Sequence, residues 1–443
     1  MKLWQKDTDD AVLLVDKFTT GNDREMDASL APFDVLGSLA HTHMLHDVGL
    51  LTTQDYALAK TGLQQLYKEV SAPNFTIPPD VEDIHSYVEF ILTERMGDAG
   101  KKIHSARSRN DQVLLDVKLF LRHQIELLIP AIVQLFTTLQ QKSELHKNDL
   151  LPGYTHLQLA MPSSFGLWLG AYAESLVDDV LTIKTAFDIV NKNPLGSAAG
   201  YGSSFPINRQ LTTDLLGFDS MNYNVVYAQM GRGKVERILA AALANLADTL
   251  AKMSMDACLF MNQNFGFISF PNNLTTGSSI MPHKKNPDVF EIIRAQCNLI
   301  KALPNDMMML TTNLPSGYHR DMQLLKEKIF PAFEIMQSCL AMMNLMMNNM
   351  VVAKDIVLHE KYAYLFSVEA VNRLVLQGVP FRDAYKTVGK QIDAGAFIPV
   401  TSVEHVHEGS IGNLCNEQIA QEMNRIVSSF PFDKINTALQ KLL

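Results

Sequence analysis

Long stretches of the chain repeat apolar residues with the period of an α-helix. After Asn110, apolar residues recur at spacings of four and three, at Val117, Leu121, Ile125, Leu128, Ile132, Leu135 and Leu139. The mean step of about 3.7 residues is that of one helix face. Pro130 interrupts this pattern without ending it, which predicts a single kinked helix that tolerates the missing hydrogen bond.

Other segments predict further long helices. Residues 234–265 contain neither Gly nor Pro, and as one helix they would extend roughly 48 Å. Residues 164–190 and 288–303 are also helical in pattern, and residues 332–377 lack Gly and Pro altogether. Alternating β patterns are nearly absent. The pattern therefore predicts an all-α protein built on a central bundle of long helices.

The two ends of the chain carry shorter helices and more turns than the middle. We expect an N-terminal helical domain at residues 1–104, a central long-helix bundle at 105–354 and a small helical domain at 355–443. Loops between such helices are where function should lie. Helices this long, with apolar residues on more than one face, need neighbours to cover them, so we expect a homo-oligomer.

Composition narrows the class of protein. The chain has 38 Lys and Arg against 47 Asp and Glu, a net charge of −9, which disfavours a nucleic-acid partner. Hydrophobic residues make up 47% and charged residues 19%, as in ordinary globular proteins. The apolar stretch 335–353 contains Gln, Asn and many Met residues, so we interpret it as a buried bundle helix and expect no membrane partner.

The cysteines and the N-terminus indicate a cytoplasmic protein. Four cysteines are widely spaced and form no CxxC pair, so we expect buried thiols in a reducing compartment and no zinc site. The first ten residues contain three aspartates and no apolar run. We therefore expect neither a secretory signal nor a transit peptide.

Residues 276–295 (TGSSIMPHKKNPDVFEIIRA) carry the strongest chemical signal. A Gly-Ser-Ser turn leads through Lys284 to an expected helix, with Asn286 as its N-cap and Pro287 as its first residue. Backbone N–H groups, the helix dipole and an ammonium group would then face one point, which favours an anion. The alternative is a flexible surface loop with a good helix cap.

A second segment, residues 102–113 (KIHSARSRNDQV), places Arg107 and Arg109 directly before a long apolar helix. Two arginine forks suit a dicarboxylate ligand. The alternative is a capping segment in which Asp111 and Arg109 pair on the surface.

Two more segments are less specific by themselves. Residues 152–164 (PGYTHLQLAMPSS) set His156 between a proline and a helix, and a lone histidine there is more often structural than catalytic. Residues 314–328 (LPSGYHRDMQLLKEK) place polar groups along a helix start, which would otherwise be a solvated face.

Together with residues 81–89 (VEDIHSYVE), these segments closely resemble the argininosuccinate lyases of the aspartase/fumarase superfamily. GSSxMPxKxNP is the signature of the superfamily, whereas DIH, RSRNDQ, GYTHLQ and LPxxYxxDxQxxKE resemble argininosuccinate lyases in particular. The resemblance is strong over residues 83–330, continues through GVPFRDAY and is weaker before residue 27.

The resemblance implies a β-elimination that splits argininosuccinate into arginine and fumarate, without a metal or an organic cofactor. It also implies a homotetramer in which three subunits build each site. Two alternatives stay open. His283 is typical of adenylosuccinate lyases, and lens crystallins are catalytically silent relatives of this family.

The same resemblance implies roles for individual residues. Ser278 is the base, acting as an alkoxide stabilised near Lys284, and His156 pairs with Glu291 near the leaving nitrogen. The remaining residues implied to bind substrate are Asp27, His85, Ser108, Arg109, Asn110, Thr155, Gln158, Ser279, Asn286, Tyr318, Gln323 and Lys326.

Two segments depart from these expectations or fall outside them. Residues 18–30 (FTTGNDREMDASL) have two extra residues; Asp27 fits the family's aspartate, but no serine falls in register with the family's serine at the arginine end. Residues 41–46 (HTHMLH) lack the HExxH spacing of a zinc site, so we expect a helix with incidental histidines.

Overall fold

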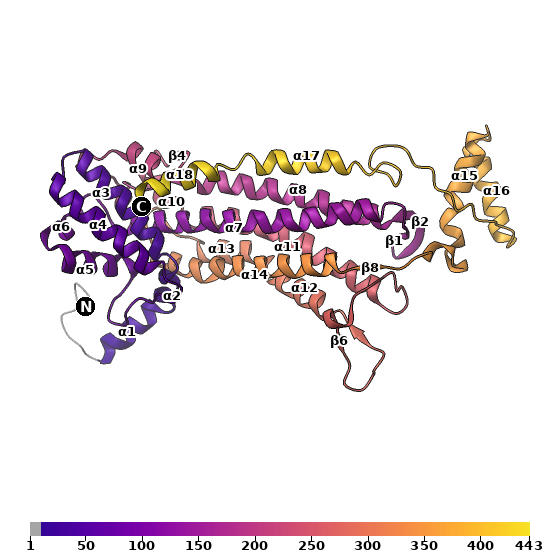
Figure 1. Ribbon diagram of the computed structural model, residues 1–443, viewed down its shortest axis with the longest axis horizontal. Helices are drawn as coiled ribbons and strands as arrows, with labels where there is room; N and C mark the ends of the chain where they lie inside the picture. Colours follow the sequence, from indigo (N-terminus) through magenta and orange to yellow (C-terminus); the bar gives the residue numbers. More distant parts are fainter. Residues whose placement is uncertain (1–9) are drawn as a thin grey trace.

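The protein is an elongated, mainly helical molecule whose computed structural model describes residues 10–443 (Figure 1). A lobe of shorter helices lies at one end and a bundle of long helices forms the middle. Two short helices, α15 (Ser367–Leu376) and α16 (Phe381–Asp393), lie at the other end. The predicted all-α fold class is confirmed.

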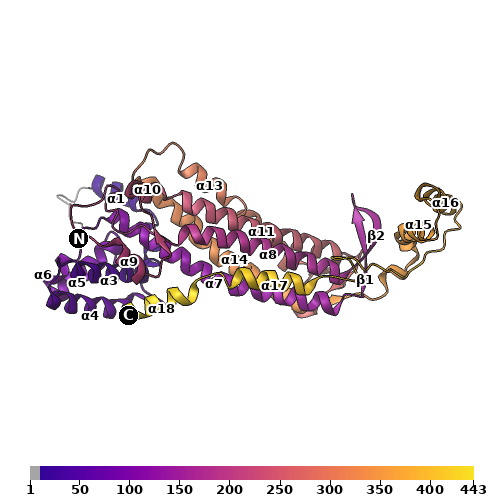
Figure 2. The ribbon, with the colours of Figure 1, turned by 90° about the horizontal axis from the view of Figure 1, so that it is seen from above.

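Long helices form the central bundle (Figures 1 and 2). They are α7 (Arg109–Leu145), α8 (Phe165–Val190), α11 (Lys234–Met261), α12 (Asp288–Ile300) and α14 (Leu324–Asn348). The apolar stripe predicted on α7 is buried along its whole length, and burying each of its Leu and Ile side chains contributes roughly 1.5–3 kcal/mol. The helix runs through Pro130, as predicted.

The N-terminal lobe packs against the start of α7. Its helices are α1 (Asp10–Thr20), α2 (Asp23–Ala28), α3 (Ala31–Asp47), α4 (Thr53–Val70), α5 (Ile84–Met96) and α6 (Asp98–Lys102). The histidines of HTHMLH lie within α3, as predicted. His41 is buried, and its Nε2 lies 2.9 Å from the carbonyl oxygen of Ser105.

Strands are few and short in the described chain. The main pair is an antiparallel hairpin of β1 (Leu150–Thr155) and β2 (Gln158–Ser164), which the sequence did not reveal. The other strands are two residues long: β3 (Lys192–Asn193), β4 (Ser220–Met221), β5 (Ile268–Ser269), β6 (Thr276–Gly277), β7 (Lys285–Asn286) and β8 (Val351–Val352).

The start of α12 differs from the prediction by one residue. Asn286 belongs to β7, Pro287 is the N-cap and the helix begins at Asp288. Pro287 has a ψ of 37°, which is not helical, so it precedes the first turn instead of forming it. Asn286 therefore does not cap the helix.

The remaining helices connect the bundle to its two ends. They are α9 (Arg209–Leu215), α10 (Val225–Met230), α13 (Leu303–Leu310), α17 (Asn416–Val427) and α18 (Phe432–Leu442). After α16 the chain returns along the bundle, where α17 packs against α8 and α7 and α18 packs against α9 and α3. The C-terminus therefore lies beside the N-terminal lobe (Figure 1). The expected division at residues 104 and 354 stays a prediction.

Three described helices, α7, α11 and the segment Arg320–Asn348, are long and apolar enough to cross a membrane by length and composition alone. Only 50–61% of each apolar window is buried within the chain itself. Exposed apolar side chains therefore remain along the bundle. They include Leu127, Leu181, Met255, Leu299, Met342 and Leu345.

All four cysteines are free thiols. Cys297 and Cys339 are buried, as expected, whereas Cys258 and Cys415 are half-buried, which corrects the prediction for those two. The spacing of the cysteines along the sequence could not distinguish these two from the buried pair.

Candidate active site

A polar cavity of about 220 Å³ lies where the N-terminal lobe meets the bundle. It is lined from the end of α1, from α2, from the start of α5 and the residues before it, from the start of α7, from the turn before α11 and from the segment that leads into the first turn of α14. Seven of the residues predicted to bind substrate line it, namely Asp27, His85, Arg109, Asn110, Tyr318, Gln323 and Lys326. Segments separated by about 300 residues in the sequence thus form one cavity.

Lys326 is buried in this cavity between two carboxylates. Its Nζ contacts Asp27 and lies 2.6 Å from Asp23 Oδ1. Burial alone would lower the pKa of Lys326, but the two aspartates outweigh it and the pKa is raised. Gln323 donates from Nε2 to the carbonyl oxygens of Thr19 and Thr20, at 3.1 and 3.0 Å, and so fixes the end of α1 against the cavity.

Arg109, at the first position of α7, is held by three acceptors. Its Nη1 lies 3.0 Å from Asp83 Oδ2 and 3.3 Å from Glu82 Oε2, and its Nη2 donates to Ser86 Oγ at 2.9 Å. The alternative interpretation, in which Arg109 pairs with Asp111 on the surface, is wrong, because Asp111 is not at the surface. Asp111 is buried, and its burial is tolerated because both of its carboxylate oxygens accept hydrogen bonds from backbone N–H groups.

Asp111 and Ser108 shape the start of α7. Asp111 accepts from the N–H groups of Ser108, Gly196 and Ala198, and Ser108 Oγ accepts from Asn110 N at 3.3 Å. These bonds form a capping box that also ties the helix to residues 194–206. Ser108 therefore lies beside the cavity and serves as a helix cap, while burial raises the pKa of Asp111 to about 6.

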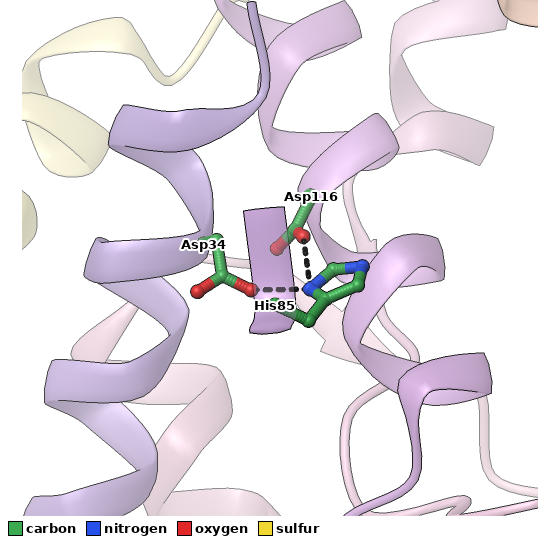
Figure 3. Close-up of side chains that lie close together, drawn as sticks. All are labelled: Asp34, His85 and Asp116. Atoms are coloured by element: carbon green, nitrogen blue, oxygen red, sulfur yellow. Dashed lines mark hydrogen bonds and ion pairs between the residues drawn. The ribbon is translucent and has the colours of Figure 1, made fainter. Parts of the chain in front are cut away.

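His85 lies between two buried aspartates from different helices (Figure 3). Its Nδ1 donates to Asp34 Oδ2 of α3 at 2.6 Å, and Asp116 Oδ2 of α7 lies 3.6 Å from the same nitrogen. Burial alone would lower the pKa of His85, but Asp34 and then Asp116 raise it to about 9. The ring is therefore an imidazolium at neutral pH, at the edge of the cavity.

The same three side chains offer ligand atoms within 4.8 Å of one another, as a metal site would. The 2.6 Å contact between Nδ1 and Asp34 is the length of a charge-assisted hydrogen bond. An ion bound by both atoms would need them further apart, because each metal–ligand bond is itself about 2 Å long. The cluster is therefore an ion pair with a second acid, in which burial and Asp34 raise the pKa of Asp116 well above its ordinary value.

The residues predicted for the leaving-group side lie elsewhere, at the turn of the β1–β2 hairpin. Thr155, His156 and Gln158 are all exposed there, at the end of the bundle away from the N-terminal lobe (Figure 1). His156 has a φ of 54° and Leu157 a φ of 58°. Two consecutive residues without the freedom of glycine in this region strain the backbone, and such strain clusters at functional sites.

The segment between β6 and β7 projects from the bundle as a loop (Figure 1). Ser278 Oγ accepts from the backbone N–H groups of Ile280 and Met281, at 3.3 and 3.0 Å. Donors aimed at this oxygen favour its anionic form. At the base of the loop, Asn286 Nδ2 donates to Thr276 Oγ1 at 3.2 Å, which connects the two strands.

Three other predicted residues of this region face outward. Ser279 and Lys284 are exposed on the loop, and Glu291 is exposed in the first turn of α12. The projecting loop and the hairpin turn are both distant from the polar cavity at the N-terminal lobe (Figures 1 and 2). One chain thus carries the predicted residues as three separate groups.

Sequence reasoning missed several residues of the cavity and its surroundings. Asp23, Glu82 and Arg232 line the cavity, and Asp34 and Asp116 lie behind His85. A signal existed for the last two, because each is a lone acid inside an apolar helical run, PFDVLGSLA and VLLDVKLFL. Such an acid is buried at a high free-energy cost unless a cation pairs with it.

The sequence of the chain is similar to those of known lyases. The sequence model of a family described as Lyase matches residues 8–301. The chain is 58% identical over 442 residues to a protein named argininosuccinate lyase from Parabacteroides distasonis, covering 100% of this chain and 99% of that one. It is 35% identical over 392 residues to a protein of the same name from Thermotoga neapolitana, covering 88% of this chain and 98% of the relative.

Solved structures share the fold. An EDDS lyase in complex with formate has a TM-score of 0.77 at 21% identity and covers 96% of this chain and 94% of its own. A class II fumarase from Schistosoma mansoni has a TM-score of 0.70 at 14% identity and covers 94% and 95%.

Proposed function

The chain belongs to the argininosuccinate lyase family, and we propose that it splits argininosuccinate into arginine and fumarate at sites to which several subunits contribute. The observation that carries this proposal is the polar cavity, which collects residues of four family segments and yet contains no residue of the hairpin turn or the projecting loop. A complete set of the implied residues therefore requires other chains.

The reaction needs a base and a site for negative charge. A proton leaves the carbon next to a carboxylate of the succinyl part, and that carboxylate then carries a second negative charge. The bond from the neighbouring carbon to the guanidino nitrogen breaks, its electron pair goes to that nitrogen, and a proton completes arginine. The double bond formed between the two carbons gives fumarate.

Ser278 is the proposed base. The two N–H groups that point at its oxygen support this role, because they stabilise an alkoxide before substrate arrives. Lys284, exposed on the same loop, would supply positive charge when the loop closes over the site. Ser279 and Asn286 would contact substrate from this loop.

His156 and Glu291 are proposed for the leaving-group side. The strained hairpin turn holds His156 away from its own bundle, where it can enter the site of another subunit. Glu291, exposed at the start of α12, would pair with it and favour its charged form. Thr155 and Gln158 flank the histidine and would bind substrate beside it.

The cavity residues are proposed to hold the substrate itself. Arg109 and Asn110 would bind the fumarate-forming end, with the imidazolium of His85 nearby. Asp27, Tyr318, Gln323 and Lys326 would surround the arginine end. Every proposed step uses side chains or backbone groups of the protein.

A cytoplasmic homotetramer is the proposed assembly. The exposed apolar side chains of the bundle support it, because the half-buried long helices would cover one another in a larger bundle. This accounts for their apolar faces without a membrane.

Ultraviolet detection of fumarate tests the proposed function. The purified protein is given argininosuccinate, with adenylosuccinate and aspartate in parallel reactions. We expect fumarate from argininosuccinate alone. Fumarate from adenylosuccinate would instead identify an adenylosuccinate lyase, the alternative that His283 suggests. No fumarate in any of the three reactions would contradict the proposal.

A further inference from the structure

The polar cavity contains a guanidinium group that its own chain leaves largely unpaired. Arg232 lies in the turn between α10 and α11, lines the cavity and is only 6% exposed. Its Nη2 donates to the carbonyl oxygen of Met322 at 3.1 Å. Its Nε and Nη1 have no hydrogen-bond partner among the described residues.

The backbone of the turn places this arginine firmly. Gly233 has a φ of 78°, and a Cβ there would lie 2.4 Å from a side-chain carbon of Thr311. Only glycine fits, so the residue before it is fixed against α14 and the segment that precedes it. The guanidinium carbon of Arg232 lies 5.6 Å from the ring centre of Tyr318, which holds the side chain from the other side.

No carboxylate neutralises Arg232 at ion-pair distance within the described part of the chain. The nearby Glu236 uses Oε2 to accept the N–H of Gly233 at 2.6 Å and so caps α11. A buried arginine without an ion-pair partner is unfavourable, and unpaired buried polar groups are rare in native proteins and call for an explanation. An anionic ligand would satisfy it.

The charges across the cavity indicate which anion. Lys326 contacts both Asp23 and Asp27, so these three groups together carry one net negative charge. They suit an ammonium and leave Lys326 little positive charge to offer a carboxylate. Arg109 is at the α7 side of the cavity, where the proposed function places the carboxylates of the succinyl part.

We propose that Arg232 binds the α-carboxylate of the arginine part of the substrate, while Asp23 and Asp27 accept its α-ammonium. This inference rests on the proposed function. It adds that Arg232 makes the enzyme specific for arginine as the amine that leaves. The cavity would recognise the two charges of a zwitterionic α-amino acid group: Arg232 binds the carboxylate, and the net negative charge of the aspartates around Lys326 binds the ammonium. An amine that lacks the α-carboxylate leaves the buried guanidinium unpaired.

The reverse reaction provides a direct test, because fumarate can be offered arginine or agmatine. Agmatine keeps the amine and the guanidinium of arginine and lacks only the α-carboxylate. We expect the wild-type enzyme to use arginine on the order of 100-fold more efficiently, by kcat/KM, than agmatine. We expect Arg232→Gln to lose about that factor with arginine, mostly through KM, and less than about threefold with agmatine.

The controls separate binding from structure. Arg95→Gln removes an arginine that pairs with Glu69 on the surface of the N-terminal lobe, and both amines should react as with the wild type. Arg232→Lys should recover part of the arginine preference. Equal losses with arginine and agmatine in Arg232→Gln would show a structural role and overturn the proposal.

A measurement on the wild-type enzyme covers the case in which Arg232→Gln does not fold. Arginine and argininamide are compared as product inhibitors of fumarate release from argininosuccinate. We expect arginine to inhibit at a concentration on the order of 100-fold lower, because the amide carries no negative charge. Equal inhibition would overturn the carboxylate subsite, whereas failure to release fumarate at all would overturn the proposed function beneath it.

Discussion

His85 illustrates how single residues set the electrostatics of this site. Three acids from three elements face it: Asp34 of α3, Asp116 of α7 and Asp83, the N-cap of α5. Together they outweigh burial and keep the ring protonated, so the protein presents a fixed cation at the cavity edge. Asp34 and Asp116 act through His85, and we regard them as positioning residues.

This arrangement predicts a pH dependence. The kcat/KM of the wild type should fall as pH rises through about 9, where His85 loses its proton. Asp34→Asn removes the main group that raises this pKa, so the fall should move to lower pH, toward the ordinary value of 6.5. Asp47→Asn, an exposed acid on the same helix, is the matched control and should keep the wild-type profile.

Stability should follow the same group. The folded-state pKa of His85 lies above the value of 6.5 that applies when the chain unfolds. Its stabilising contribution is therefore complete below pH 6.5 and is lost as pH rises through about 9. A pH profile of Asp34→Asn that matches the wild type, in both activity and melting temperature, would contradict this account of His85.

Ser278 is the residue whose loss should affect catalysis most directly. We expect Ser278→Ala to lower kcat by on the order of 10³-fold or more, because the proton acceptor is removed. The side chain lies on a projecting loop, so the oligomer should remain folded by circular dichroism and size-exclusion chromatography. Ser279→Ala should act mainly on KM, and near-normal turnover by Ser278→Ala would assign the base elsewhere.

At the scale of elements, the long helices follow directly from the sequence. The apolar period of α7 and the absence of Gly and Pro in α11 predicted both helices, because burial on one face is a local pattern. The β1–β2 hairpin was missed because its strands contain Pro152 and Pro162, which are unusual inside strands. Its pairing depends on packing against neighbouring segments and not on an alternating pattern.

The site was predictable only in part for a similar reason. The segments implied by resemblance were identified as motifs, and seven of the residues do line one cavity. The cavity itself brings together segments distant in sequence, so Arg232 and Asp23 had no local signal strong enough to include them. The proposed roles of Arg232 and Asp23 depend on charged residues of other elements, and only the folded chain places those residues beside them.

The N-terminal cap of α7 can be tested by its contribution to the stability of the protein. Ser108→Ala removes the N-cap acceptor while leaving the bonds of Asp111 in place. We expect a loss of about 1 kcal/mol in stability, seen as a melting temperature lower by a few degrees in a thermal scan. Ser71→Ala, on the exposed residue after α4, should melt as the wild type does. An unchanged melting temperature with a large rise in KM would make Ser108 a binding residue first.

At the scale of the whole molecule, one chain holds the residues proposed for catalysis and binding far apart. The cavity lies where the N-terminal lobe meets the bundle, and the hairpin turn lies at the opposite end of the bundle (Figure 1). A rod-like bundle cannot bend its ends together, because its core is continuous along the helices. In an oligomer, the hairpin turn or the projecting loop of one chain can lie beside the cavity of another, if the bundles pack against one another in opposite directions.

Subunit complementation tests this central claim most directly. Ser278→Ala and His156→Asn proteins, each inactive alone, are mixed and allowed to exchange subunits, and fumarate release is measured. In an equal mixture, half of the sites receive an intact Ser278 and half receive an intact His156, each from a different chain. About one quarter of the sites therefore contain both residues, so about one quarter of the wild-type activity should return. Exchange is verified by co-purification of differently tagged chains. If exchange is complete and no activity returns, the two residues do not come from different chains of one site, and the account of a shared site is wrong.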